Sequence, residues 1–101
     1  MNPSDLEGKR IALVLTNERG ESVAFTGIAH WEGEQLYMLR NKPDPPVPIL
    51  EEWYRRIRAT PGNSKDALLG AEYFVMLRVG DIATGTDESE FQKIGLRWPA
   101  P

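Results

Sequence analysis

The stretch KRIALVLTNERGESVAFTGIAHWEGEQLYMLR, residues 9–40, decides the fold class of this chain. Large apolar side chains alternate with smaller ones along Lys9–Thr16, which is the period of a β-strand with one core face. The residues NERG (17–20) have the Asn-first, Gly-last order of a type I turn, so a hairpin is expected. The second strand runs from Ser22 to Trp31, and Gly27 in its middle marks a bend, a bulge or a close backbone approach.

A third strand completes a three-stranded meander over residues 9–40. Residues 32–34 (EGE) form a second tight turn, and Gln35–Arg40 gives an aliphatic strand. In a meander the first and third strands run in the same direction. We therefore expect the basic residues around Arg10 and Arg40, which begin the first strand and end the third, at opposite ends of the sheet.

A proline-rich connector and a helix follow. NKPDPPVP (41–48) contains four prolines, which cannot donate to a sheet ladder and which hold the chain extended. Pro48 suits the first position of a helix, and an amphipathic helix is predicted over 49–59, with acidic residues early and arginines late. Its apolar stripe consists of Ile49, Leu50, Trp53, Tyr54 and Ile57.

Two more strands are predicted in the C-terminal third. AEYFVMLRV (71–79) is apolar on both faces, as in a central strand, and FQKIGLRW (91–98) alternates. Residues 1–101 are thus expected to form a single domain of the α+β class, mainly β. Its architecture would be a small, strongly bent sheet or barrel, SH3-like or Sm-like, of about five strands with one amphipathic helix, or alternatively an α+β roll.

Composition narrows the functional classes. The chain has 101 residues and no cysteine, which excludes disulfides, thiolate metal sites and cysteine nucleophiles. The first ten residues, MNPSDLEGKR, lack the apolar core of a secretory signal, and the apolar run 73–77 is too short to span a bilayer, so a cytoplasmic protein without membrane contact is expected. A net charge of −3 argues against a protein that coats nucleic acid.

One family resemblance bears on these expectations. LEGKRIALVLTNERGESVAFTGIAHWEGEQLYML (6–39) resembles the first Sm motif of Sm-like proteins, and VMLRVGDIATG (75–85) is similar to the second. The resemblance implies a small barrel and an RNA partner. However, residues 32–35 (EGEQ) occupy the place of the Asp and Asn that face the RNA base in that family, and Val79 interrupts the Arg-Gly pair of the second motif.

No residue pattern indicates catalysis, a cofactor or a metal. His30 is the only histidine, and no nucleophile-elbow, phosphate-loop or dinucleotide motif is present. Glu51 and Glu52 are adjacent on the predicted helix and point about 100° apart, so they do not converge as paired catalytic carboxylates. A small hydrolase would need a concave pocket that no sequence pattern identifies. We predict a protein that is not an enzyme.

The favoured function is a small binding module that acts through protein contacts and self-associates as a homo-oligomer. Trp31 at a turn and Trp98 near the C-terminus are expected to be partly exposed, as contact aromatics are. An unpaired strand at 71–79 or 91–98 would also pair edge to edge with a second copy.

The alternative is an Sm-like RNA-binding protein. In that hypothesis Arg55, Arg56 and Arg58 contact phosphates or bases, with Trp53 and Tyr54 beside them as stacking surfaces. The competing interpretation of the same segment is a helix with surface salt bridges whose aromatic residues lie in the core.

Overall fold

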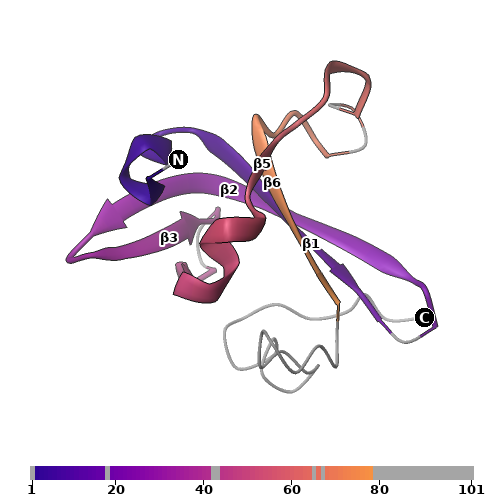
Figure 1. Cartoon of the computed structure of the whole chain (residues 1–101), viewed down its shortest axis with the longest axis horizontal. Helices are drawn as coiled ribbons and strands as arrows, with labels where there is room; N and C mark the ends of the chain where they lie inside the picture. Colours follow the sequence, from indigo (N-terminus) through magenta and orange to yellow (C-terminus); the bar gives the residue numbers. More distant parts are fainter. Residues whose placement is uncertain (1, 18, 42–43, 65, 67, 79–101) are drawn as a thin grey trace.

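In the computed structural model, residues 2–17, 19–41, 44–64, 66 and 68–78 are described, and they form a six-stranded mixed sheet with three short 3₁₀ helices (Figure 1). The strands are β1 (Arg10–Thr16), β2 (Ser22–Glu32), β3 (Gln35–Leu39), β4 (Val47–Ile49), β5 (Arg58–Ala59) and β6 (Tyr73–Arg78). The 3₁₀ helices are η1 (Pro3–Leu6), η2 (Glu51–Arg56) and η3 (Gly62–Ser64). The strand order is β4-β3-β2-β1-β6-β5, and the β1–β6 pair is parallel. The mainly-β prediction is confirmed.

The predicted hairpin between β1 and β2 is organised by one side chain. Asn17 Oδ1 accepts hydrogen bonds from the backbone N–H groups of Arg19 (3.0 Å) and Glu21 (2.9 Å). The backbone N–H of Asn17 donates to the carbonyl oxygen of Glu21 at 2.9 Å, which closes the loop. Asn17 is buried, so these bonds satisfy a polar group that is shielded from water.

The predicted meander is present, but β3 is displaced along the sheet relative to β1, and this displacement contradicts one expectation. β2 is eleven residues long; its first part pairs with β1 and its last part with β3. Ile28 is paired with Arg10 on one side and with Leu39 on the other. The prediction that Arg10 and Arg40 lie at opposite ends of the sheet is therefore wrong. The length of β2 shifts β3 along the sheet, so that the end of β3 lies level with the start of β1.

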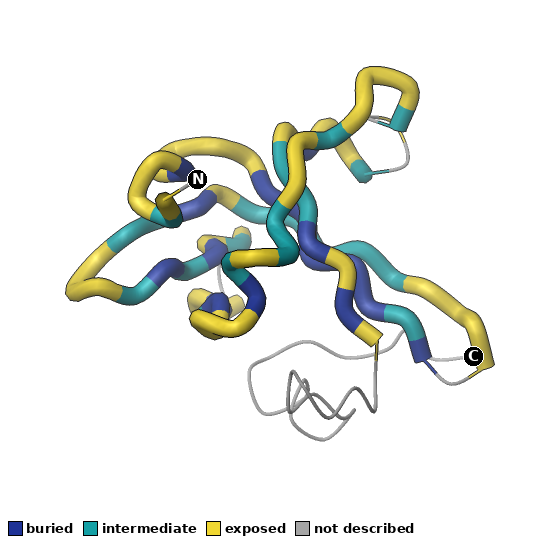
Figure 2. The backbone as a smooth tube through the Cα atoms, viewed as in Figure 1, coloured by how far each residue is buried: buried dark blue, intermediate teal, exposed yellow. Residues whose placement is uncertain are grey.

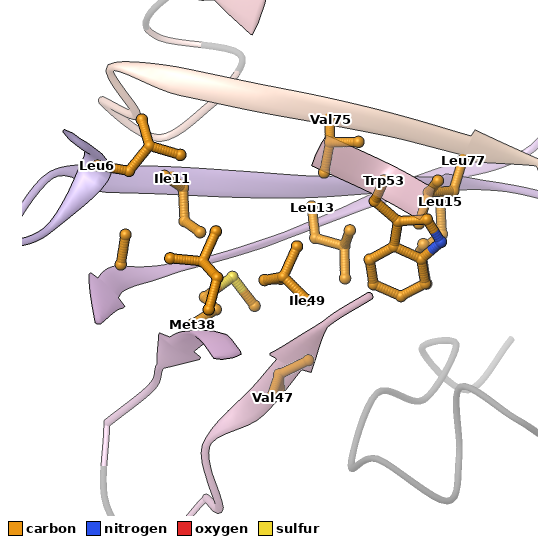
Figure 3. Close-up of a cluster of buried hydrophobic side chains, with 12 residues drawn as sticks. Leu6, Ile11, Leu13, Leu15, Met38, Val47, Ile49, Trp53, Val75 and Leu77 are labelled. Carbon is orange, nitrogen blue, oxygen red and sulfur yellow. The ribbon is translucent and has the colours of Figure 1, made fainter. Parts of the chain in front are cut away.

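The sheet curls around its core. Ile49 of β4 lines the same small cavity as Leu13 of β1 and Val75 of β6, although β3 and β2 separate β4 from β1 in the sheet. Figure 3 shows these side chains pointing toward one another, with Leu6 and Trp53 at the two ends of the cluster. Among the described residues β4 and β5 remain edges, so the sheet is strongly bent but does not close into a barrel.

The predicted helix over 49–59 is wrong in type and extent. The structure has the six-residue 3₁₀ helix η2 between strands β4 and β5. Val47 and Ile49 are buried and pair with β3, which keeps the chain extended through Leu50 (φ −65°, ψ 147°). Pro48 therefore lies in an edge strand, where its missing N–H is tolerated, rather than at the start of a helix.

The last described strand is β6, within the predicted range 71–79. It lies between β1 and the two-residue strand β5. The strand predicted at 91–98 lies outside the described residues. Within the described part of the chain, no helix is long and apolar enough to cross a membrane.

Gly27 is the position where the bend is most sensitive to substitution. A Cβ atom there would meet the carbonyl oxygen of Leu39 and lie 2.6 Å from Cγ of Met38. We expect Gly27→Ala to lower the free energy of unfolding by about 1–3 kcal/mol, the cost of overpacking a core. Urea unfolding measures it, with Gly62→Ala as control because a Cβ atom at Gly62 meets nothing within 4 Å. Equal stability of the two variants would contradict the close approach at Gly27.

Candidate protein-contact site

The two sides of the sheet differ in what covers them. Directly opposed residues of paired strands point to the same face, and successive residues of a strand alternate. Ile11, Leu13 and Leu15 of β1 face the core. The opposite side, which we call the outer face, includes the apolar residues Ala12, Val14, Ala24, Ile28, Leu39, Phe74 and Met76 and the polar residues Arg10, Thr16, Ser22, Thr26 and Arg78.

The outer face is apolar and in part exposed. Ile28 and Leu39, which are paired neighbours, are each 37% exposed, and Met76 is 56% exposed. Figure 2 shows the alternation of buried and exposed residues along β6. Apart from Thr26, the polar residues of the outer face lie at the ends of the strands: Arg10 and Thr16 on β1, Ser22 on β2 and Arg78 on β6. The outer face therefore has the composition of a contact surface.

Within the described part of the chain, one edge of the sheet is open next to this surface. Among the described residues, β5 pairs with β6 only at Phe74 and Tyr73. Val75, Met76 and Leu77 therefore have no strand partner on that side within the described part of the chain. The other edge, β4, has three residues and contains Pro48, which blunts strand addition. An exposed apolar side chain and an open backbone edge thus meet at Met76.

The structure places Trp31, a predicted contact residue, on the core side of β2. Its side chain is half-buried and packs against the core. Its ring centroid lies 6.5 Å from that of Tyr54, with the planes tilted by 60°. Trp31 therefore joins β2 to η2 and is not part of the outer face. Trp98, the second predicted contact residue, lies outside the described residues.

The three arginines of the nucleic-acid hypothesis lie on one short segment. Arg55 and Arg56 are in η2 and Arg58 is in β5. Nη1 of Arg58 donates to the carbonyl oxygens of Arg55 (2.6 Å) and Ile57 (3.0 Å), which holds its guanidinium against the backbone. Trp53 is 1% exposed and belongs to the core, so it offers no surface on which a base can stack.

An open hollow of about 440 Å³ lies beside η2. The described residues that line it are Leu50, Glu51, Glu52, Tyr54 and Arg55. Two carboxylates and one guanidinium make this hollow an unfavourable place for a phosphate group. The structure thus brings the three arginines near one another but surrounds the hollow beside them with acidic side chains.

Glu7 and His30 form a polar clasp between the N-terminal segment and β2. Glu7 Oε1 accepts the backbone N–H of Trp31 at 3.0 Å, and the two carboxylate oxygens lie 3.1 and 3.3 Å from Nδ1 of His30. Nε2 of His30 lies 3.6 Å from Oε2 of Glu32. The hydrogen bonds from Trp31 and then from His30 hold the pKa of Glu7 below its ordinary value of 4.5. These contacts provide a hydrogen-bond partner for the end of β2, which extends beyond its pairing with β1.

The clasp does not extend to a metal site. Among the described residues, no group of three or more His, Cys, Asp or Glu side chains is placed to hold a metal ion. Comparisons of the chain with protein-family models, with curated proteins and with solved structures found no match.

Sequence reasoning did not identify the outer face, although its signal was present. The run Tyr73–Leu77 is apolar on both faces, which predicts a central strand. The structure leaves one of those faces exposed at Met76. The exposed residues Ile28 and Leu39 belong to the predicted meander. That they lie opposite each other follows only from the observed register of β2 and β3.

Replacing Glu7 tests the clasp. Because the folded-state pKa of Glu7 is lowered, its contribution to stability is present above pH 4.5 and is lost as the pH falls through the folded value. We expect Glu7→Gln to be less stable than the wild type at pH 7 and the difference to shrink below pH 4.5. Urea unfolding across this range measures it, with Glu34→Gln as control because Glu34 is exposed in the turn between β2 and β3. A pH-independent difference would contradict the clasp.

Proposed function

We propose that this chain is a small, non-enzymatic binding module that acts through protein contacts and associates with copies of itself. The observation that carries the proposal is the exposure of the large apolar side chains Ile28, Leu39 and Met76 on the outer face. Removing such side chains from water stabilises a contact by roughly 25 cal/mol per Å² of apolar area, before the entropy cost of association.

A second copy suits this surface better than a strongly charged partner. The charged residues at the margin of this surface have both signs: Arg10 is opposite Ile28 in the sheet, and Glu72 Oε2 accepts the backbone N–H of Arg10 at 3.2 Å. Two such margins can meet without a large like-charge repulsion. The open edge of β6 is also compatible with antiparallel pairing across a two-fold axis, the commonest symmetry of homo-oligomers.

The proposed fold is a small barrel of the SH3-like or Sm-like kind, opened at one edge. The meander β1–β2–β3 and the curl that brings β4 against β1 and β6 support it. Within the part of the chain that the structure describes, two features differ from a closed barrel. β1 pairs with β6 in parallel, and β4 has three residues.

RNA binding is the second candidate, supported by the three arginines between η2 and β5. It draws less support from the surroundings, because Glu51 and Glu52 line the adjacent hollow and Trp53 is buried. If RNA is the partner, Arg55→Ala with Arg56→Ala lowers both the affinity and the steepness of its salt dependence.

Light scattering over a concentration series tests the proposed self-association. We expect the purified wild type, treated with nuclease, to show a mass that rises above one chain with concentration. Met76→Lys and Ile28→Lys should each raise the dissociation constant by about tenfold or more, because a charge then enters the contact.

Leu69→Lys is the matched control. Leu69 is 59% exposed, close to the 56% of Met76, but lies in a loop away from the outer face. A mass of one chain at every concentration would contradict self-association. Equal effects of Met76→Lys and Leu69→Lys would contradict the outer face as the contact surface.

A further inference from the structure

We propose that Met76 is a peroxide-sensitive control point, and that oxidation of its thioether to the sulfoxide separates the associated copies. The inference rests on the proposed function, since it concerns how that contact is regulated. It adds a modification site and a chemical class of oxidant, hydroperoxides.

Accessibility selects Met76 from the sulfur atoms of the chain. The sequence has three methionines and no cysteine, so no thiol competes for an oxidant. Met38 is 0% exposed in the core, whereas Met76 is 56% exposed. Met1 lies outside the described residues. Among the described residues, Met76 is therefore the sulfur that peroxide reaches first.

The reaction needs only the oxidant itself. A hydroperoxide transfers one oxygen atom to the sulfur lone pair, its O–O bond breaks, and the sulfoxide forms. With hydrogen peroxide the second product is water. The sulfur is oxidised by two electrons and the peroxide is reduced by two, with no net release of protons. The sulfoxide is reducible, so the change is reversible.

The neighbours of Met76 determine what the sulfoxide does. Met76 is paired with Val14 on β1, Val14 is paired with Ala24 on β2, and Phe74 precedes Met76 on the same face of β6. Val14, Ala24 and Phe74 carry no hydrogen-bond donor for the S=O group. The donor-bearing residues Thr16 and Arg78 come next on the same face, at the ends of β1 and β6. In a single copy water solvates the sulfoxide, because the side chain is exposed; in a contact between two outer faces that water is removed. The cost therefore falls on association and not on folding.

The experiment treats the wild-type protein with hydrogen peroxide, locates the sulfoxide by mass spectrometry of peptides, and measures the mass by light scattering. We expect oxidation at Met76 before Met38 and a rise of the dissociation constant by about tenfold or more, as for a buried polar group without a partner. The unfolding midpoint should stay unchanged when it is measured at a concentration where the untreated protein is a single chain, because association itself stabilises the folded form. Oxidation should also slow as protein concentration rises, because association covers Met76.

Two variants complete the test. Met76→Leu keeps an apolar side chain without oxidisable sulfur, so it should associate and resist peroxide. Met76→Gln is polar and should behave as the oxidised protein without treatment. If the untreated protein associates but Met76→Leu loses association on treatment, or the protein oxidised at Met76 keeps its mass, this inference is overturned and the proposed function stands. If the untreated protein is a single chain at every concentration, the proposed function fails first.

Discussion

The close approach of β3 to Gly27 is the constraint on which the rest of the structure depends. With no side chain at Gly27, the backbone of Leu39 and the side chain of Met38 lie where a Cβ atom would stand. β2 can then serve both halves of the sheet, pairing with β1 along its first part and with β3 along its last. The curl that follows brings Ile49 of β4 against β1 and β6 and encloses the core.

The same curl gives the sheet an enclosed side and an outer face that is exposed only in part, since Ala12 and Val14 on it are buried. Trp53, Leu6 and the inward side chains of five strands fill the enclosed side. The outer face keeps the apolar side chains Ile28, Leu39 and Met76, beside the part of β6 that no other described strand pairs with on that edge. Burial of apolar area that stabilises the core would stabilise a contact in the same way, which links the fold to the proposed self-association.

The local parts of the fold were predictable, and the parts set by distant contacts were not. The strands of the meander follow from period-two patterns and turn residues, and β6 follows from a run that is apolar on both faces. The helix over 49–59 was predicted from its apolar spacing, but pairing of Val47 and Ile49 with β3 holds that start extended, and no local pattern encodes that pairing. Arg10 and Arg40 lie at the same level of the sheet, and predicting this would have required the length of β2. Trp31 was chosen for being aromatic at a turn, whereas its ring packs on Tyr54.

The most direct test of the central claim, that the outer face joins copies of this chain, is a dilution series of ¹⁵N-labelled protein followed by amide NMR. The account predicts that the shifts that change with concentration concentrate on β6 around Met76 and on the paired residues Ile28 and Leu39. The amides near the exposed residues Leu50 and Leu69 should stay unchanged. Shifts that concentrate around Trp31 and Tyr54, or none at all, would contradict it.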